Sequence, residues 1–525
     1  MNPEEIKKKQ KRVMIYVMII SLICVVGVSY AFFTAGMSSE TSTTVRADAG
    51  TMKITYDGGA NINLAGIYPK DDVWATKTIT VTGNNTTDAE MYYKLTLVVD
   101  SNTFKTDDPL QYELVSTNDS TNGEIIPTIS KTDITGTSIE LGSGHFAKAN
   151  NAKHTYLLKI YYPKKATSQN ANQGAAFSAH VEITSAKAPK TNGKLSELVL
   201  YNNEVKTPIT APGKEVSTAS EALLASTPDD YGTSYYFRGA VKNNYVEFAN
   251  KCWRIVRVGG DGSVKLILHN DNTAGVANPC DSANNSASAA FARYSETTYT
   301  SAFNTNYNDN AYVGFKYGTV GASDYATTHA NTNNSTILTN LEAWYNNNLK
   351  TYESVIDDNV WCNDKTNVTD ETYDPWNYTP NGLGYANNVT FYGATQRLVS
   401  STSGSAGGTG LSLKCNGKLS KITSKIGLIT ADELAFAGYA AGTTAGTGNT
   451  TTYLQENATD TYWWSLSPGN FYGNSARVWI VGGSSGVFGH RSVGNTSAVR
   501  PSISLKSTTN VTGNGTSSSP FVVKI

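Results

Sequence analysis

The chain begins with a short basic stretch that runs directly into a long uncharged apolar segment. Five Lys and Arg residues between Lys7 and Arg12 precede this segment, which extends from Val13 to Phe33. A run of this length can cross a bilayer as a helix. Because basic flanks stay in the cytoplasm, residues 1–33 are predicted to be a cytoplasmic flank and a transmembrane segment, with everything after them outside the cell.

The apolar segment has two interpretations, and the residues leave both open. A permanent anchor would hold the protein on the extracellular face of the plasma membrane. The sequence Ser29-Tyr30-Ala31 also has the small-x-small form of a signal-peptide cleavage site. Export follows from either interpretation, so we expect a cell-surface protein whose partner is the membrane itself.

Charge argues against one class of partner. The chain has 42 basic and 43 acidic residues, for a formal net charge of −1. Proteins that bind nucleic acid carry a basic patch or stripe, and here the only basic run belongs to the membrane flank. We therefore expect no nucleic-acid partner.

Four cysteines fall in the exported part of the chain, where disulfides can form and persist. Cys362 and Cys415 lie in similar settings, each followed by Asn, and pairing them would close a long, loop-rich insert. We predict this disulfide and leave the pairing of Cys252 with Cys280 open. No CxxC occurs, which argues against a zinc ribbon or a redox site of the thioredoxin type.

Residues 45–188 read as a series of short strands. Apolar and polar residues alternate from Tyr93 to Val99, from Tyr156 to Tyr162 and from Phe177 to Ile183. Alternation with a period of two places one face of a strand on a core and the other in water. Several such strands without intervening helices predict an antiparallel β-sandwich.

The start of this domain carries a family resemblance. Ala31-Phe32-Phe33-Thr34, then Ala49 to Ile54, then Lys77 to Val81 before Asn84-Asn85, resembles TasA/camelysin-type exported proteins. The resemblance implies a β-sandwich behind a specialised signal peptide, and some members of the family form extracellular fibres. The peptidase activity claimed for camelysins has no counterpart here, since no HExxH motif occurs.

The amino-acid composition changes after residue 188. Residues 189–234 are rich in Pro, Lys, Thr and Ser, and we predict a linker with one short helix there. Residues 235–525 are predicted to form a second domain. A Gly-rich turn at Gly259–Gly262 predicts a hairpin, Ser335 is placed to cap a helix, and Thr430 with Glu433 forms a capping box.

The end of the chain carries a second resemblance. Gly427 to Glu433, Tyr462 to Pro468 and Ala498 to Leu505 resemble a domain of unknown function in Firmicutes surface proteins. That domain is similar to the C-type-lectin-like fold, which is related to formylglycine-generating enzymes and is used by variable proteins of diversity-generating retroelements. The resemblance implies a C-type-lectin-like α+β domain on the surface of a Gram-positive-type bacterium.

This resemblance also implies where ligand would bind. In the variable proteins, diversified residues of a restricted set of types face ligand from a fixed scaffold. Between Trp463 and Pro501, stiff apolar residues alternate with residues of those types. The expected ligand-binding residues are Asn470, Phe471, Tyr472, Asn474, Ser475, Phe488, His490, Arg491, Asn495 and Ser497. The alternative is an ordinary set of loop residues, because one sequence shows no variation.

Catalytic and metal-binding patterns do not appear in the sequence. Asp261, Asp271 and Asp364 are isolated, and neither EF-hand spacing nor the calcium triplets of animal lectins occur. No cysteine near the C-terminal strands matches the active-site cysteines of the related enzymes. We therefore expect no enzyme activity, catalytic residue, metal or cofactor.

Together these features predict a mainly β protein with some α: an N-terminal transmembrane helix, an antiparallel β-sandwich, and a C-type-lectin-like domain. We expect a membrane-anchored bacterial recognition or adhesion protein that binds a protein or glycan on another cell or host. The alternatives are a structural fibre or biofilm-matrix subunit, and an enzyme of the formylglycine-generating type. The oligomeric state stays open.

Overall fold

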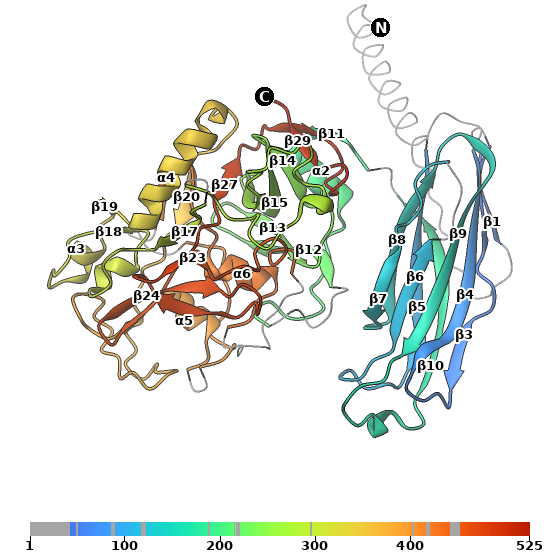
Figure 1. The fold of residues 1–525 in the computed structure, drawn as a ribbon, viewed down its shortest axis with the longest axis horizontal. Coiled ribbons are helices and arrows are strands. Elements are labelled where there is room, and N and C mark those ends of the chain that lie inside the picture. The colour runs from blue at the N-terminus through green and yellow to red at the C-terminus, as the bar shows by residue number, and fades with distance from the viewer. Residues whose placement is uncertain are drawn as a thin grey trace, which may run out of the picture. The chain divides into compact units, whose positions relative to one another are not determined.

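The chain divides into two compact units, Met1–Ala188 and Pro189–Ile525, each built mainly of antiparallel strands (Figure 1). The computed structural model describes residues 43–48, 51–85, 90–116, 122–186, 189–214, 216, 221–294, 297–401, 404–415, 421–441 and 452–525. The predicted membrane segment lies outside these ranges. Within them, no helix is both long enough and apolar enough to span a membrane.

The first unit consists of two antiparallel sheets. One has the order β1-β2-β4-β9-β6-β7 and the other β3-β10-β5-β8, with a 3-10 turn, η1, at Asn170–Asn172. The strands are β1 (Thr43–Asp48), β2 (Thr51–Asp57), β3 (Ile62–Ala65), β4 (Lys70–Asn85), β5 (Met91–Asn102), β6 (Gln111–Ser116), β7 (Ile129–Asp133), β8 (Ser138–Phe146), β9 (Ala149–Tyr162) and β10 (Ala176–Ser185).

Alternation along the strands builds the core of this unit. Leu95 and Leu97 on β5 are buried while their neighbours are partly exposed, and Leu158 and Ile160 on β9 are also buried. Strands of both sheets contribute to one apolar cluster. The first unit is therefore an antiparallel β-sandwich, as the period-two pattern predicted.

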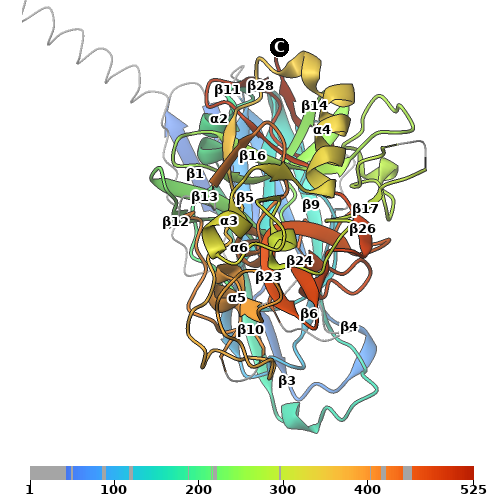
Figure 2. The same cartoon turned by 90° about the vertical axis from the view of Figure 1, so that its left-hand side faces the viewer.

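The second unit contains a large sheet with the order β11-β28-β29-β14-β15-β13-β12, to which β16 and β27 are added through β15. Figure 2 shows this unit from the side. The strands are β11 (Asn192–Lys194), β12 (Ala222–Pro228), β13 (Thr233–Gly239), β14 (Tyr245–Phe248), β15 (Lys251–Val258), β16 (Val264–Asn270), β27 (Ser502–Leu505), β28 (Asn510–Thr512) and β29 (Phe521–Val523).

A smaller sheet carries most of the predicted binding residues. Its order is β17-β26-β23-β24-β25, and β21 pairs with β23. The strands are β17 (Thr300–Ala302), β21 (Thr390–Phe391), β23 (Trp463–Tyr472), β24 (Ser475–Val481), β25 (Phe488–Ser492) and β26 (Thr496–Ala498). Two short pairs complete the unit: β18 (Lys316–Tyr317) with β19 (Asn333–Asn334), and β20 (Asn359–Cys362) with β22 (Lys421–Ser424).

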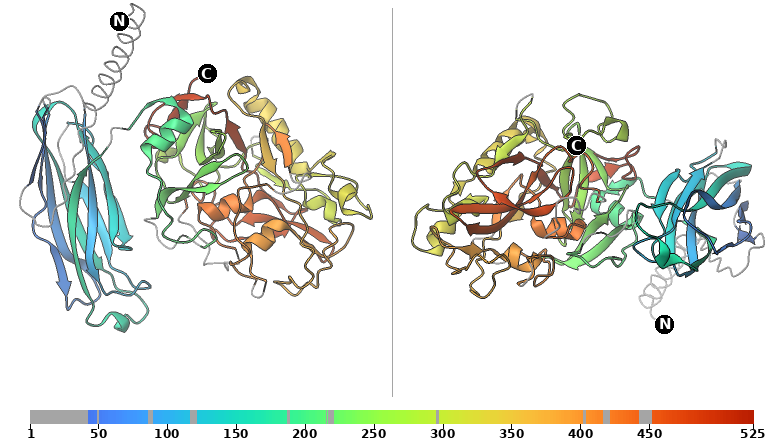
Figure 3. Two further views of the ribbon diagram at one scale, coloured as in Figure 1. Left: turned by 180° about the vertical axis from the view of Figure 1, so that it is seen from behind. Right: turned by 60° about the horizontal axis from the view of Figure 1, so that its bottom comes forward.

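Short helices pack around these sheets (Figure 3). They are α2 (Leu195–Asn202), α3 (Tyr325–His329), α4 (Thr336–Asn348), α5 (Gly393–Leu398) and α6 (Ala431–Ala437), with 3-10 turns η2 (Ser282–Asn284), η3 (Asn310–Val313) and η4 (Lys350–Tyr352). Ser335 caps α4, since its hydroxyl accepts a hydrogen bond from the Leu338 amide at 3.3 Å. The predicted mixture of mainly β with some α is confirmed.

The predicted linker, residues 189–234, is instead the first part of the second unit. β11 pairs with β28 near the C-terminus, and β12 pairs with β13. Leu195, Leu198 and Val199 of α2 are buried in the main core. The polar composition of this segment suggested a linker, but one buried helical face and two strand pairings are enough to include it in the fold.

Buried tryptophans and arginines fill the second unit. Trp253, Trp463 and Trp464 are fully buried in one large cluster. Arg500 is also buried; its guanidinium lies 5.1 Å from the Trp463 ring and donates to the carbonyl oxygen of Leu268 at 2.8 Å. The carbonyl oxygens of Leu268 and Leu454 accept hydrogen bonds from two of its three nitrogens, which lowers the cost of burying the charge.

Both pairs of exported cysteines form disulfides. Cys362 pairs with Cys415, as predicted, and Cys252 pairs with Cys280, which the sequence had left open. The second pair joins β15 to the loop after β16. The first joins β20 to the segment that leads into its partner strand β22.

Removal of the Cys362–Cys415 disulfide is expected to destabilise the second unit. Replacing both residues with Ser removes a cross-link between positions 53 residues apart. In the chain-entropy model this lowers the free energy of unfolding by about 4 kcal/mol. Urea unfolding followed by tryptophan fluorescence measures the loss, because every tryptophan except Trp74 lies in this unit. An unchanged midpoint would contradict the expectation.

Candidate functional site

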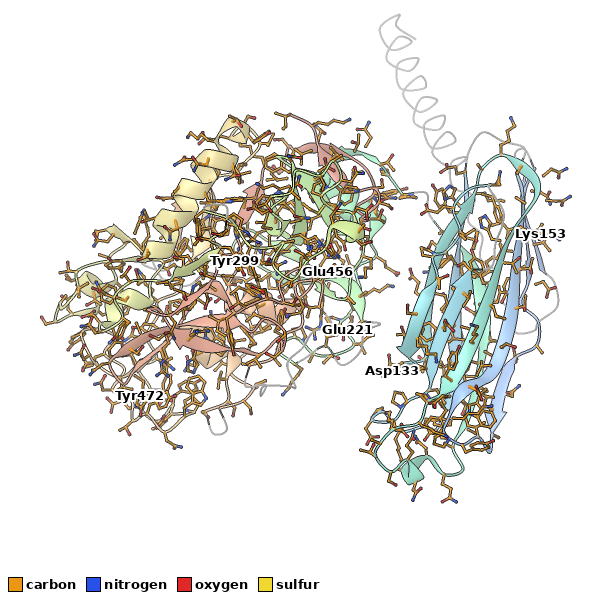
Figure 4. All side chains as sticks on the ribbon, in the orientation of Figure 1. Asp133, Lys153, Glu221, Tyr299, Glu456 and Tyr472 are labelled. Carbon is orange, nitrogen blue, oxygen red and sulfur yellow. A yellow bond between two sulfur atoms is a disulfide. The ribbon has the colours of Figure 1, made fainter. Side chains whose placement is uncertain are left out.

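The predicted ligand-binding residues differ in how far they are buried. Asn470, Phe471, Phe488 and Ser497 are buried, Ser475, His490 and Arg491 are partly exposed, and Tyr472, Asn474 and Asn495 are exposed. Tyr472, labelled in Figure 4, lies at the end of β23 at the outside of the unit. The ten residues therefore do not form one continuous exposed surface.

Four of these residues are buried, which corrects their predicted exposure, and the three other than Asn470 belong to the core. Successive side chains of a strand point to opposite faces, so Phe471 points away from the face that carries its neighbour Tyr472. Phe488 packs against Trp479, with ring centroids 4.9 Å apart. Ser497 is fully buried in β26, opposite Ser301 of β17.

Strand register brings several of the remaining residues onto one face of the smaller sheet. Asn470 lies opposite Arg477, Arg477 lies opposite Ser492, and Trp479 lies opposite His490. Residues directly opposite one another in a sheet share a face. Alternation adds Tyr472 and Ser475 to this face, which we call the polar face.

Arg491 lies on the other side of the sheet. It is next to His490 in β25, so its side chain points the opposite way. Its guanidinium lies 4.8 Å from the ring of Tyr462, an exposed residue just before β23. Arg491 is thus separated from the polar face by the sheet itself.

Three polar groups on the polar face have no protein partner among the described residues. The side-chain nitrogen and oxygen of Asn470 are both buried and make no hydrogen bond, and the same holds for Nδ1 of His490. The Arg477 side chain is partly exposed, and it makes no ion pair or hydrogen bond within the described part of the chain. Buried polar groups are usually paired, so the unpaired atoms of Asn470 and His490 call for an explanation.

The charge of Arg477 reaches His490. Burial, together with the nearby Arg477 guanidinium, lowers the pKa of His490 to about 4. The imidazole is therefore neutral at neutral pH, and the guanidinium is the charge that dominates this part of the face.

Aromatic side chains from a distant loop cover the polar face. The ring of Trp376 lies 4.7 Å from His490 and 5.5 Å from Phe391, which is directly opposite Asn470. Tyr378 stacks on Tyr472 with ring centroids 3.7 Å apart and an interplanar angle of 5°. We call Trp376 and Tyr378 the aromatic cap.

The turn that carries the aromatic cap is held in a costly conformation. Asn377 and Thr379 have φ values of +59° and +50°, in the left-handed region. That region is rare for a β-branched residue such as Thr379. The Asp374 carboxylate maintains the turn by accepting the amides of Tyr378 at 2.6 Å and Thr379 at 3.1 Å. Strained backbone of this kind is often found at ligand sites.

Sequence reasoning missed Arg477 and the aromatic cap. Arg477 stands between Ala476 and Val478, and the alternation that placed those two in the scaffold also places Arg477 on the polar face. This signal was available in the sequence. Trp376 and Tyr378 come from far earlier in the chain, and no local pattern predicts that they pack against β23 and β25.

A second cluster of charged residues lines a small cavity of about 40 Å³ beside the Cys362–Cys415 disulfide. Glu433 accepts from Lys265 Nζ at 2.8 Å and from Arg257 Nε at 2.9 Å. Arg257 also contacts Asp229 at 3.1 Å, and Arg397 pairs with Asp364 and Asp432 at 2.6 and 2.7 Å. We call this set the ion network.

The charges of the ion network satisfy one another. Burial alone would raise the pKa of Glu433, but the charges of Lys265 and Arg257 lower it to about 2. Burial lowers the pKa of Lys265 to about 8 against the opposing effect of Glu433. The cavity has room for only a few waters. We therefore assign the ion network a structural role, although perturbed pKa values also occur at active sites.

A larger hollow of about 210 Å³ lies near the Cys252–Cys280 disulfide. Several polar side chains in its wall already have protein partners. Asn270 donates to the Pro279 carbonyl at 3.0 Å, and Asp271 pairs with Lys251 at 2.8 Å. Arg293, also in its wall, donates to the Phe291 carbonyl at 2.9 Å. The hollow therefore offers a ligand fewer open hydrogen-bonding groups than the polar face does.

Within the described ranges, no group of three or more His, Cys, Asp or Glu residues is arranged to hold a metal ion. No protein-family model matches this chain, and no curated protein matches its sequence.

Replacing Glu433 with Gln tests the ion network. Gln can still complete the capping box with Thr430, so the change removes the charge and leaves Lys265 and Arg257 buried without it. Loss of one partner of a buried ion pair destabilises by about 3–5 kcal/mol. We expect a loss of this size in urea unfolding.

The matched control for this variant is Glu353→Gln. Glu353 forms an exposed pair with Lys350 at 2.8 Å, and pairs of this kind contribute little. An equal change in both variants would contradict a special role for the ion network.

Acid is expected to destabilise the second unit through two histidines whose pKa values are lowered in the folded state. Burial and nearby positive charge lower the pKa values of His329 to about 3 and of His490 to about 4, from 6.5 in the unfolded chain. Between pH 6.5 and 4 the unfolded state binds more protons, so the free energy of unfolding falls as the pH falls. The slope is up to about 1.4 kcal/mol per pH unit for each histidine. Urea midpoints measured across this range check it, and a smaller slope is expected for His329→Gln.

Proposed function

We propose that this chain is an exported recognition protein of a Gram-positive-type bacterial surface, anchored by its N-terminal segment, and that its second unit has a C-type-lectin-like fold. The observation that carries the proposal is the polar face. Asn470, Arg477 and His490 offer hydrogen-bonding groups that have no partner among the described residues, beside exposed and stacked tyrosines. A ligand would supply what these groups lack.

Two further features support an exported binding protein. The second unit contains two disulfides, which suit an oxidising compartment outside the cell. Aromatic and arginine side chains also provide much of the affinity at protein interfaces. The ligand is a glycan or protein on another cell or host, and the first unit serves as the stalk.

A structural fibre subunit is the second candidate function. It is favoured by the first unit, in which β1 and β7 are the last strands at the two edges of one sheet. Edge strands can pair with another copy of a chain. Filaments that lengthen with protein concentration would support this role, which is compatible with a binding role for the second unit.

The enzyme alternative receives no support from the cysteines. Those in the described residues are joined in two disulfides, so none of them presents a free thiol for cysteine-dependent oxidation.

The recognition role is tested by replacing Tyr472 with Ala. We expect at least a tenfold loss of affinity of the full chain for a panel of immobilised cell-surface glycans and for whole cells. The reason is that Tyr472 is exposed and stacks on Tyr378 of the aromatic cap. The unfolding midpoint should change little, since exposed substitutions usually alter stability only slightly.

Tyr462→Ala is the matched control. Tyr462 is an equally exposed tyrosine on the opposite side of the same sheet, so its removal should leave binding intact. Equal losses in both variants, or none in either, would place the recognition surface elsewhere.

A further inference from the structure

We propose that the polar face and its aromatic cap bind a carboxylate-bearing sugar, the uronic-acid type of residue found in acidic glycans. This inference rests on the proposed recognition function and names the ligand class of the same site. Three features of the site point to this ligand: the charge of Arg477, the open amide of Asn470 and the nearby tyrosine rings.

Arg477 calls for a negative partner. It lies on β24 between Asn470 and Ser492, and its guanidinium carbon is 5.8 Å from the Tyr472 ring. Within the described ranges it makes no ion pair. A guanidinium presents parallel donors that match the two oxygens of a carboxylate, and such paired bonds are short and strong.

The Asn470 side chain needs both a hydrogen-bond donor and a hydrogen-bond acceptor from a ligand. It is the one asparagine or glutamine in the described residues whose side-chain nitrogen and oxygen are both buried and unpaired. Neighbouring hydroxyl groups of a sugar both donate and accept, so they can satisfy the two ends of one amide. Nδ1 of His490 lies on the same face and can join this set.

The rings of Tyr378 and Tyr472 supply an apolar surface for the sugar ring. Tyr378 and Tyr472 stack nearly in parallel, and both keep partial exposure. The flat face of a tyrosine ring carries partial negative charge and attracts the C–H groups of a sugar ring. A flat apolar wall, a fixed cation and an open amide together match a sugar acid better than a neutral sugar, which would leave Arg477 unpaired.

The aromatic cap also controls access. Asn470 is fully buried, so a ligand reaches its amide only after the side chains that cover it move. We assign this movement to the Asp374–Thr379 turn, because Trp376 and Tyr378 both contact Phe391, the residue opposite Asn470. The turn is fixed by the Asp374 carboxylate while Thr379 is held in the left-handed region. Release of this conformation would favour the movement.

Calorimetric titration of the full chain with three probes of equal length tests the proposal. The probes are a galacturonic acid trimer, the neutral galactose trimer and a triglutamate peptide. We expect the galacturonic acid trimer to bind at least tenfold more tightly than either of the others. Arg477→Gln should abolish this preference, and Arg477→Lys should retain only part of it, because Lys cannot form the paired contact.

Lys350→Gln is the control for charge. It removes the same unit of positive charge at an exposed position near the end of α4, and binding of the galacturonic acid trimer should not change. Urea unfolding of each variant establishes that the fold is retained. Equal losses for Arg477→Gln and Lys350→Gln would overturn the proposal, because they would show general electrostatic attraction.

The other outcomes separate this inference from the proposed function. Equal binding of the two sugar trimers would overturn the role of the carboxylate, and equal binding of triglutamate would overturn the role of the sugar. If no probe binds while Tyr472→Ala still weakens binding to cells and glycans, the sugar-acid site is wrong and the recognition face stands. If Tyr472→Ala also has no effect, both fail.

Discussion

The carboxylate of Glu433 is the contact on which the organisation of the second unit depends. It accepts the Thr430 amide at 2.9 Å at the start of α6, and it accepts from Arg257 on β15 and Lys265 on β16. One buried side chain thus fixes a helix to two strands of the large sheet. Such pairs gain little net stability, because desolvation offsets attraction, but misplacing one charge is costly. The ion network therefore selects one arrangement of these elements.

That arrangement positions the polar face. Ser467 of β23 accepts the Ala431 amide at 2.9 Å, which ties the smaller sheet to the start of α6. Arg397 of α5 reaches Asp432 at 2.7 Å, and its neighbour Thr395 donates to the Gly469 carbonyl at 2.7 Å, next to Asn470. The strand that carries Asn470 is thus held by rigid elements, which is what a preorganised binding site requires.

Local patterns in the sequence predicted local structure well. The capping box at Thr430 and Glu433, the cap at Ser335 and the alternating strands of the first unit each depend on residues a few positions apart. Strand register could not be predicted in the same way, because it depends on pairing between strands that are distant in the sequence. Phe471 and Tyr472 are adjacent in sequence and of similar type, yet one is core and the other surface. The role of Trp376 depends on contacts with β21 and β25, and the inclusion of residues 189–234 depends on pairing with β28.

Local sequence patterns did not predict the polar face and its aromatic cap, and this region also has the strongest chemical reason to bind a ligand. A buried amide without partners costs about 1–3 kcal/mol, and a β-branched residue in the left-handed region adds a cost of similar order. Asn470 and Thr379 bring both costs to one small region of the second unit. An apolar residue at position 470 would avoid the first cost if packing were the only demand. An amide at this position beside Arg477 is explained if the polar face binds a ligand, because the ligand would supply hydrogen-bond partners for Asn470 and Arg477.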